Sequence, residues 1–95
     1  MASTKEYLTY VLDLLREVKG ISYKKMMSEY ILYKDEHIFG GIYDDRFLIK
    51  KTKTGIELGL IEQIPYPGAK PMLLVDSENA DEIKDLVNRV CKELN

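Results

Sequence analysis

Hydrophobic residues recur on one side of a helix near the start of the chain. The stripe lies within residues 3–19, and Ser3 with Glu6 fits a capping box, in which two side chains satisfy backbone N–H groups of the first turn. After Lys19, Gly20 can take the left-handed conformation that ends a helix. The apolar positions of the stripe are Tyr7, Leu8, Val11, Leu12, Leu15 and Val18. We therefore predict a helix over residues 3–19 with one buried face.

A second stripe at helical spacing ends the chain. Its apolar positions are Ile83, Leu86, Val87, Val90, Cys91 and Leu94. Asp76, Ser77 or Asn79 can cap the start of this helix, because their short side chains accept hydrogen bonds from the first N–H groups. Both terminal helices have a single apolar face, so each needs a sheet to cover it.

The region between the helices carries β signals. Three segments rich in tyrosine and apolar residues, 23–34, 37–43 and 46–51, are separated by Asp35-Glu36 and Asp44-Asp45, which can form tight turns. We predict a three-stranded antiparallel meander. Gly40-Gly41 in the middle segment is typical of a β-bulge or of a close approach of two backbones.

A short helix and a stiff connector are predicted after the meander. Thr54 and Glu57 fit another capping box and favour a helix over residues 54–62. Pro65, Pro67 and Pro71 then restrict the chain to an extended crossover in which Gly68 alone allows a turn, and residues 72–75 form a buried strand. Together these elements predict an α+β fold, a two-layer α/β sandwich with a mainly antiparallel sheet under the N- and C-terminal helices.

Composition narrows the class of protein without naming a chemistry. With 95 residues, a 45% hydrophobic fraction and a net charge of -2, the chain is expected to form one globular domain over residues 1–95. One cysteine, Cys91, excludes an internal disulfide, and with the charged start of the chain it indicates the cytoplasm. No apolar run approaches the roughly 20 residues of a membrane span.

Residues suited to catalysis or metal binding are sparse. Asp44 and Asp45 could share a metal or act as acid and base, but their position between two strands favours a turn. His37 is expected at a hairpin edge, and Cys91 on an apolar helix face is expected to be a small core residue. No glycine-rich phosphate-binding motif is present. We therefore expect no enzyme, no metal and no cofactor.

The basic residues offer only weak signs of nucleic-acid binding. Lys24-Lys25 and Lys50-Lys51-x-Lys53 are short clusters among acidic residues, and lysines at strand ends commonly protect sheet edges. Lys70 differs, since a rigid proline connector carries it. For Lys70, a recognition role and a plain solvent-facing role stay open.

Three blocks of the sequence resemble a known family. KKMMSEYILY (residues 24–33), FGGIYDDRFLIK (39–50) and YPGAKPM (66–72) are similar to the N-terminal domain of the TfoX/Sxy family of bacterial competence regulators. The blocks cover most of the chain, and the resemblance implies a two-layer α/β domain with a role in transcriptional regulation through another regulator.

Two departures limit what can be carried over from the family. Met27-Ser28 stands where the family commonly has Phe-Gly, so a role of that glycine does not pass to Ser28. The longer regulators carry a second helical domain, whereas this sequence ends at Asn95, so we expect a stand-alone N-terminal domain.

The candidate recognition surface consists of matched positions that are too polar or too special in backbone conformation for a core role. We predict that the hairpin tip and the connector form a mixed-charge patch that is free to meet another molecule. The candidate residues are Lys25, Asp44, Asp45, Arg46, Tyr66, Gly68 and Lys70.

The leading hypothesis is a non-catalytic regulatory or protein-interaction module that binds another protein. One alternative is a small enzyme or ligand-binding domain with a Lys/Asp/Tyr patch, which needs a pocket that gathers Asp44 or Asp45 with Lys70 and a tyrosine. Direct nucleic-acid binding is a second alternative, although the charge balance disfavours it. Membrane binding is not expected, and a homodimer stays open.

Overall fold

The structure, a computed structural model, describes residues 3–94. Met1 and Ala2, part of the stretch used to predict a cytoplasmic location, and Asn95, the end of the sequence, lie outside the described residues. The elements in chain order are α1 (Lys5–Leu14), β1 (Ile21–Met26), β2 (Glu29–Lys34), β3 (His37–Ile42), β4 (Phe47–Ile49), α2 (Lys53–Glu57), β5 (Glu62–Gln63), β6 (Met72–Leu74) and α3 (Ala80–Leu94).

The start of α1 differs from the predicted capping box. Its N-cap is Thr4, whose Oγ1 accepts a hydrogen bond from the Tyr7 N–H at 3.1 Å. Ser3 instead bonds to Glu29 across the fold, with its Oγ 2.5 Å from the Glu29 Oε1. The predicted pairing of Ser3 with Glu6 was wrong, because the Ser3 hydroxyl donates to the Glu29 carboxylate of β2 instead.

The end of α1 is also earlier than predicted. The helix stops at Leu14 rather than at residue 19, because the chain tightens into turns in which the N–H groups of Arg16 and Val18 donate to carbonyls three residues back. Leu15 and Val18 are nevertheless buried, as the stripe predicted. Gly20 follows with a φ of +79°, which confirms the left-handed conformation expected there.

The C-terminal helix agrees with its prediction. Asn79, one of the three predicted caps, accepts hydrogen bonds at its Oδ1 from the N–H groups of Asp81 (2.9 Å) and Glu82 (3.1 Å). The buried residues of α3 are Ile83, Leu86, Val87 and Val90. Cys91 packs half-buried against the core, and burial raises the pKa of its thiol, so its predicted role as a small apolar residue is confirmed.

The predicted single strand over residues 23–34 is in fact a hairpin. β1 and β2 pair antiparallel, and Met27 and Ser28 form the turn between them. Met27 has a φ of +57°. The sequence concealed this turn because neither residue is the glycine, asparagine or aspartate that usually takes a left-handed conformation.

The two predicted aspartate-containing turns are confirmed. Asp35 and Glu36 join β2 to β3, Asp44 and Asp45 join β3 to β4, and all four residues have φ between 50° and 68°. Left-handed residues of this kind fit two-residue hairpins, whose twist matches that of the strands. The meander therefore has four antiparallel strands, β1 to β4, rather than three.

Gly40 and Gly41 serve both purposes expected of them. The pairing of β2 with β3 shifts register beside them, between Leu32 and Tyr33, which marks a bulge. A Cβ at Gly40 would collide with the Leu48 carbonyl oxygen. Neighbouring backbones therefore approach more closely here than a side chain would allow.

The short helix after the meander is displaced from its prediction. α2 covers Lys53–Glu57 and its N-cap is Thr52, whose side chain accepts from the Gly55 N–H at 3.2 Å. The predicted capping box of Thr54 with Glu57 was wrong, because the chain turns helical two residues earlier. Gly59, with a φ of +77°, follows the helix and leads into a strand that was not predicted, β5.

The proline-rich connector is a hairpin loop rather than a crossover. β5 and β6 pair antiparallel, so residues 64–71 join two neighbouring strands. We call this segment the β5–β6 loop. β6 also pairs with β4, and the sheet order is β1-β2-β3-β4-β6-β5. The predicted strand after Pro71 is confirmed, and Leu73 in it is fully buried.

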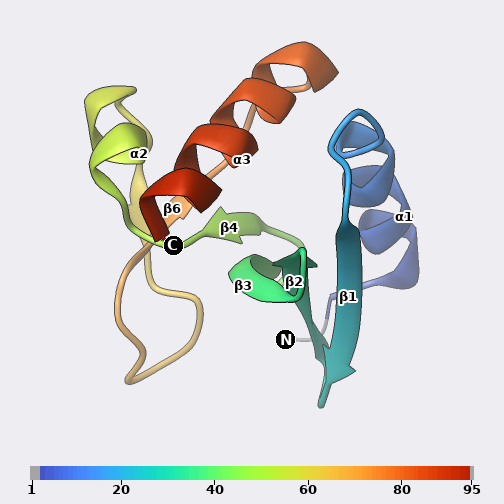
Figure 1. The fold of residues 1–95 in the computed structure, drawn as a ribbon. Coiled ribbons are helices and arrows are strands. Elements are labelled where there is room, and N and C mark those ends of the chain that lie inside the picture. Colours follow the sequence, from blue (N-terminus) through green and yellow to red (C-terminus); the bar gives the residue numbers. More distant parts are fainter. Residues whose placement is uncertain (1–2, 95) are drawn as a thin grey trace.

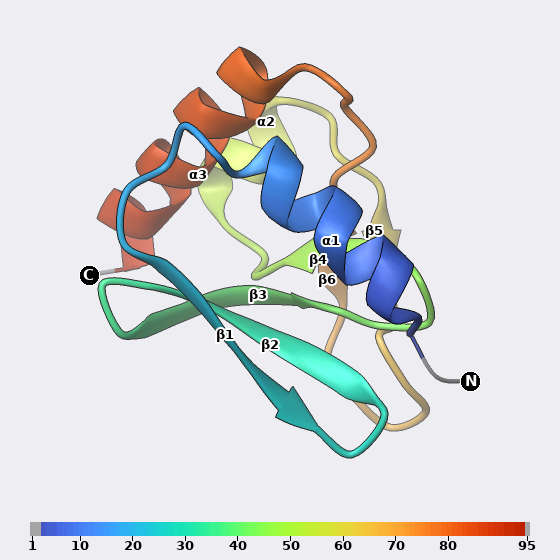
Figure 2. The same cartoon turned by 90° about the vertical axis from the view of Figure 1, so that its right-hand side faces the viewer.

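The helices cover one face of the sheet. α1 and α3 lie on the same side in the two views of Figures 1 and 2, α2 packs beside α3, and no helix among residues 3–94 covers the other side, which we call the open face. The two-layer α+β sandwich is therefore confirmed. No helix in the described part of the chain is long and apolar enough to cross a membrane. Buried residues of the core include Leu8, Val11, Leu15, Leu32, Phe39, Ile42, Phe47, Ile49, Leu73, Ile83, Val87 and Val90.

Candidate functional site

The open face carries a hollow of about 470 Å³ between the sheet and the β5–β6 loop. Lysines and tyrosines stand around a largely apolar floor, and neither aspartate nor glutamate lines it. We call it the open-face hollow. Its lining consists of Ile38, Gly40, Tyr43, Lys50, Lys51, Pro65, Tyr66, Ala69, Lys70, Pro71 and Met72.

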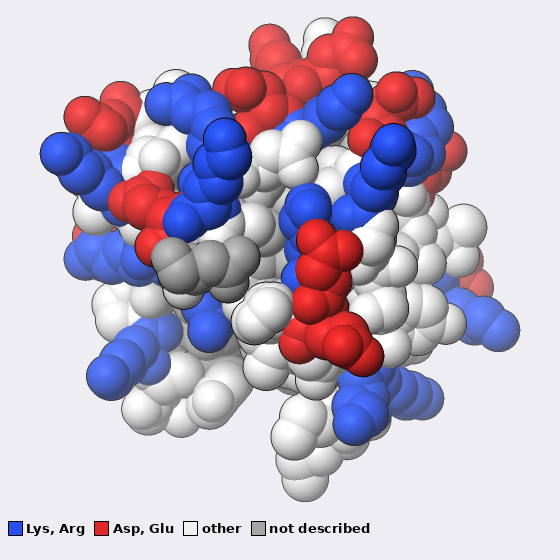
Figure 3. Space-filling model, viewed as in Figure 1, with Lys and Arg blue, Asp and Glu red and all other residues white. Residues whose placement is uncertain are grey.

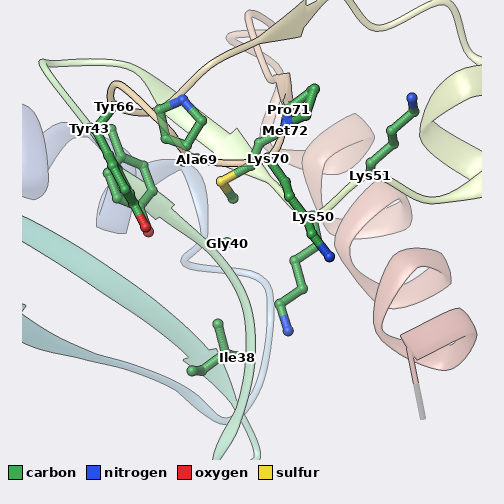
Figure 4. A pocket seen from close by; sticks show the side chains of 11 residues that line it. Ile38, Gly40, Tyr43, Lys50, Lys51, Tyr66, Ala69, Lys70, Pro71 and Met72 are labelled. Carbon is green, nitrogen blue, oxygen red and sulfur yellow. The ribbon is translucent and has the colours of Figure 1, made fainter.

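The glycine pair of β3 makes room for the aromatic end of this hollow. A Cβ at Gly41 would lie 2.7 Å from Cε2 of the Tyr43 ring, so the ring occupies the space that any larger residue would fill. Tyr66 of the loop stands beside Tyr43, with 6.0 Å between ring centroids and an interplanar angle of 45°. Figure 4 shows the two rings together at one end of the hollow. The strand and the loop thus contribute one aromatic side chain each.

The lysines of the hollow differ in whether they form ion pairs within the protein. Lys51 forms an ion pair with Glu62 at 3.2 Å. Lys50 and Lys70 are exposed and take part in no salt bridge with any residue from 3 to 94. In Figure 4 their side chains extend to the same side of the loop while Lys51 turns away. Two ammonium groups are therefore available to an anionic ligand.

The surface around the hollow is basic and apolar. On the face drawn in Figure 3, the lower left, where the β5–β6 loop lies, carries blue and white surface without red. Several apolar side chains are open to solvent there, including Tyr66, which is 56% exposed, Ile64 and Ile38. Large exposed apolar side chains beside unpaired charges are typical of a recognition surface.

Arg46, one of the predicted partner-binding residues, holds the β5–β6 loop in place. Its guanidinium donates to the Gln63 side-chain oxygen at 2.7 Å and to the carbonyl oxygens of Ile64 and Pro65 at 3.2 Å each. The side chain is half-buried. The planar fork of arginine reaches several acceptors of the loop at once, so Arg46 has a structural role, and its role in binding a partner stays a prediction.

Asp45 is likewise occupied within the fold. Its Oδ1 accepts from the Thr4 N–H at 2.7 Å, at the start of α1, and its own N–H donates to Ser3 Oγ at 3.1 Å. A carboxylate at a helix N-terminus satisfies one of the unpaired N–H groups there. Asp45 therefore docks the start of α1 against the β3–β4 turn, and its role in binding a partner stays a prediction.

Glu29 completes this junction and was not singled out by the sequence. One carboxylate oxygen accepts from Ser3, and the other accepts from the Asp44 N–H at 3.0 Å. No pattern around Glu29 signals this role, because its partners lie 15 and 26 residues away along the chain.

Asp44 remains free of side-chain hydrogen bonds to other residues in the 3–94 range. It lies in a second, smaller hollow of about 320 Å³ on the other side of Tyr66, and the two hollows share Pro65 and Tyr66. The second hollow is lined by Glu29, Asp44, Arg46, Ile64, Pro65, Tyr66 and Pro67. Unpaired charges of opposite sign thus lie on either side of one exposed tyrosine.

The other predicted residues are divided between the two ends of the sheet. Gly68 lies in the β5–β6 loop with a φ of +86°, which confirms a turn at the only flexible point among the prolines. Lys70 lines the open-face hollow. Lys25 lies on β1, the edge strand at the opposite end of the sheet, and lines neither hollow.

The sequence underrated Lys50, Lys51 and Tyr43. The lysine pair had been noted as a solvated strand end, and only the folded loop brings it near Lys70. Burial raises the pKa of the Tyr43 hydroxyl above its ordinary value of 10.0, and Tyr66 and Glu29 raise it further. This hydroxyl stays protonated at neutral pH and can act as a hydrogen-bond donor or acceptor.

Groups that could hold a metal ion are not found in the described region. Residues 3–94 contain no cluster of three or more histidine, cysteine, aspartate or glutamate side chains placed for one. His37, the single histidine, is exposed at the first position of β3. The Lys/Asp/Tyr constellation is not gathered in one lining either, because Asp44 lies in the second hollow and Asp45 caps α1.

The comparison with known proteins gives one relative. No protein-family model matches the chain. The sequence is 35% identical over 91 residues to the uncharacterized 12.7 kDa protein in the trpE 5′ region of Spirochaeta aurantia, an alignment that covers 92% of this chain and 79% of that protein. At this identity and coverage, the chain belongs to the same family as the 12.7 kDa Spirochaeta aurantia protein.

Proposed function

We propose that the chain is a non-catalytic regulatory module that binds an acidic segment of another protein in the open-face hollow. The observation that carries this proposal is the pair of uncommitted ammonium groups, Lys50 and Lys70, beside exposed Tyr66 in a lining without a carboxylate. Charges arranged in this way favour a partner of opposite sign and raise the rate of encounter.

Binding would combine charge with apolar contact. Acidic side chains of the partner pair with Lys50 and Lys70, while an apolar side chain packs on Tyr66 and on the floor at Met72. Tyrosine is enriched among residues that dominate binding energy, since it buries a large area and loses little conformational entropy. The hydrogen bonds of Arg46 keep the loop rigid, so little ordering is required on binding.

A second copy of this chain is a poorer occupant of the same hollow. A two-fold dimer whose axis passes through the hollow brings the hollow of one copy against that of the other. Lys50 and Lys70 of one copy would then lie close to the same lysines of the other, and like charges repel.

The resemblance of residues 24–33, 39–50 and 66–72 to TfoX/Sxy regulators supports a regulatory role in the bacterial cytoplasm. The resemblance implies that the chain acts through contact with another regulator. The open-face hollow offers a place where such a partner would be bound.

The test is charge reversal with a matched control. Lys50→Glu with Lys70→Glu is compared with Lys5→Glu with Lys84→Glu, which changes the net charge equally at exposed helix positions away from the hollow. Proteins captured from bacterial extract are identified by mass spectrometry, and their affinity for each purified variant is measured. We expect the first pair to weaken binding about 100-fold and the control pair to change it by less than about threefold.

Two results would contradict the proposal. Equal affinity of both charge-reversed pairs for the captured protein would mean that the hollow is not the binding site. The second result is that the wild-type chain binds nucleic acid at about 0.15 M salt and the variant with Lys50→Glu and Lys70→Glu does not. The ligand of the hollow would then be a polynucleotide.

A further inference from the structure

β1 is an unusually accessible edge strand. It stands at one end of the six-stranded sheet and has six residues, whereas β5 at the other end has two. Every residue of β1 after Ile21 is exposed. The accessible side chains include Tyr23 and Met26, and the neighbouring Met27 is 94% exposed. A long edge with exposed apolar side chains is a template for another strand.

The backbone of β1 has a free hydrogen-bonding side. Hydrogen-bonded pairs alternate along an antiparallel ladder, and the Gly20 carbonyl accepts from the Asp35 N–H at 2.9 Å just before β1. By this alternation Ser22 and Lys24 bond to β2, whereas Ile21, Tyr23 and Lys25 direct their N–H and C=O groups away from it. These three residues make no other backbone hydrogen bond within residues 3–94.

The side chains of β1 divide between the two faces of the sheet. Tyr23 pairs with Leu32 of the core, and its ring contacts the Tyr30 ring edge-on, with 5.9 Å between centroids. Tyr23 therefore lies on the helix-covered face of the sheet, but its side chain is exposed because no helix reaches it. Lys25 shares this face, while Lys24 and Met26 lie on the open face, because strand residues alternate. An added strand would cover an apolar residue and meet a lysine on each face.

The lysines also restrict which strand can be added. If a second copy paired antiparallel with β1 around a two-fold axis at Lys24 or at Lys25, that lysine would lie directly opposite the same lysine of the other copy. Like charges directly opposite one another destabilise a strand pair, and lysine on an edge strand commonly prevents self-association. An acidic strand has no such repulsion.

We propose that β1 binds an extended acidic segment of another protein as a seventh strand of the sheet. The segment carries two consecutive acidic residues opposite Lys24 and Lys25 and an apolar residue on each side, opposite Tyr23 and Met26. This order reads the same in both directions, so it fits a parallel or an antiparallel strand. Backbone hydrogen bonds to Ile21, Tyr23 and Lys25 supply affinity, and the side chains supply specificity.

This site is separate from the open-face hollow, so its test is independent of the proposed function. The probe is a synthetic peptide of about ten residues with two central glutamates, a valine on each side and threonines beyond. Two further versions of the peptide carry N-methyl groups on alternate residues, one on the odd-numbered and one on the even-numbered residues. In only one of them do the methyl groups replace the N–H groups that face β1. We therefore expect that version not to bind and the other version to bind.

The position of the peptide is read from amide hydrogen exchange of the full chain. We expect the amides of Ile21, Tyr23 and Lys25 to exchange at least about tenfold more slowly with the peptide bound, while those of Ser22 and Lys24 are already protected without it. Lys24→Glu with Lys25→Glu should weaken binding at least about tenfold, and Lys50→Glu with Lys70→Glu should leave it unchanged.

A proline substitution tests the backbone contribution directly. Lys25→Pro removes an N–H that points away from β2, so it should abolish binding and leave the β1–β2 ladder intact. Lys25→Thr keeps the N–H and serves as its control, with the melting temperature of each variant measured. If the proline variant does not fold, the N-methylated peptides decide the question on the wild-type chain.

Three outcomes would overturn the proposal. The first is failure of the peptide to bind at concentrations up to about 1 mM. The second is binding without protection of the three outward amides, or equal binding of both N-methylated versions. The third is slower exchange of those amides without the peptide as the concentration of the protein is raised. That result would mean that a second copy of the chain pairs with β1.

Discussion

The β3–β4 turn and the rim of the open-face hollow carry similar charged residues but use them differently. In the turn, Asp45 and Arg46 bind backbone groups of α1 and of the β5–β6 loop. At the rim, Lys50 and Lys70 bind no residue in the described chain. The turn therefore contributes to stability, and the rim is free to contribute to binding.

The reason for this difference lies in the backbone near each side chain. Asp45 accepts from the N–H of Thr4, the N-cap residue of α1. Arg46 donates to carbonyls of a loop in which Pro65 and Pro67 have no N–H to donate. The lysines of the rim face a lining of mostly apolar side chains. A charge near unsatisfied backbone groups becomes structural, whereas a charge above an apolar floor stays available.

Replacing Arg46 should give the largest effect on stability. Arg46→Ala removes four hydrogen bonds from a charged, half-buried group, three to the β5–β6 side and one to the Tyr43 carbonyl oxygen. We expect the free energy of unfolding in urea to fall by about 2–3 kcal/mol. Lys70→Ala should change it by no more than about 0.5 kcal/mol. The comparison between turn and rim would fail if the two variants were equally stable.

Arg46→Lys refines this experiment. It keeps the positive charge but loses the planar fork that reaches Gln63 and two carbonyls at once, so we expect it to recover little of the lost stability. A lysine variant as stable as the wild type would show that charge alone, and not the directed hydrogen bonds, holds the loop.

Replacing the two adjacent aspartates of the turn one at a time should give a smaller difference in stability, and the two positions are closely matched. Asp44 and Asp45 both have a φ of 54°, so an alanine at either position adds the same backbone strain. Only Asp45 accepts from the Thr4 N–H. We expect Asp45→Ala to lower the free energy of unfolding by about 1 kcal/mol more than Asp44→Ala does. Equal losses would mean that the carboxylate does not hold α1.

Much of the fold could be predicted from the sequence because it depends on local patterns. Two amphipathic stripes and two aspartate-containing turns predicted both terminal helices and most of the meander. The turn at Met27-Ser28 was missed because its residue types carry no turn signal. β5 was missed because a two-residue strand depends on pairing with β6 rather than on a pattern of its own.

The candidate site was less predictable because it depends on contacts between distant residues. Tyr66 and Lys70 were found from the rigid connector, and the structure places them together. The structural contacts of Arg46 and Asp45 were not predicted. Sequence spacing does not reveal that Arg46 bonds to a loop 17 to 19 residues later, or that Asp45 bonds to a helix start 41 residues earlier. Lys50 joins the site only through the folded loop.

The smallest expected effect comes from a third charge bound to backbone, Glu93 at the end of α3. Its carboxylate accepts from the N–H groups of Lys53 (2.7 Å) and Thr54 (3.1 Å) at the start of α2. The hydrogen bond with the Thr54 side chain is the main cause that lowers the pKa of Glu93 below its ordinary value of 4.5, and these backbone bonds lower it further.

Because the pKa of Glu93 is lower in the folded chain, its contribution to stability is present above pH 4.5 and is lost as the pH falls through the folded value. We expect Glu93→Gln to be less stable than the wild type at pH 7, by less than Asp45→Ala, since the carboxylate is fully exposed to solvent. Urea unfolding of both proteins at several pH values tests this, with Glu57→Gln as an exposed control. A stability difference that did not shrink in acid would show that Glu93 acts through packing and not through its charge at the start of α2.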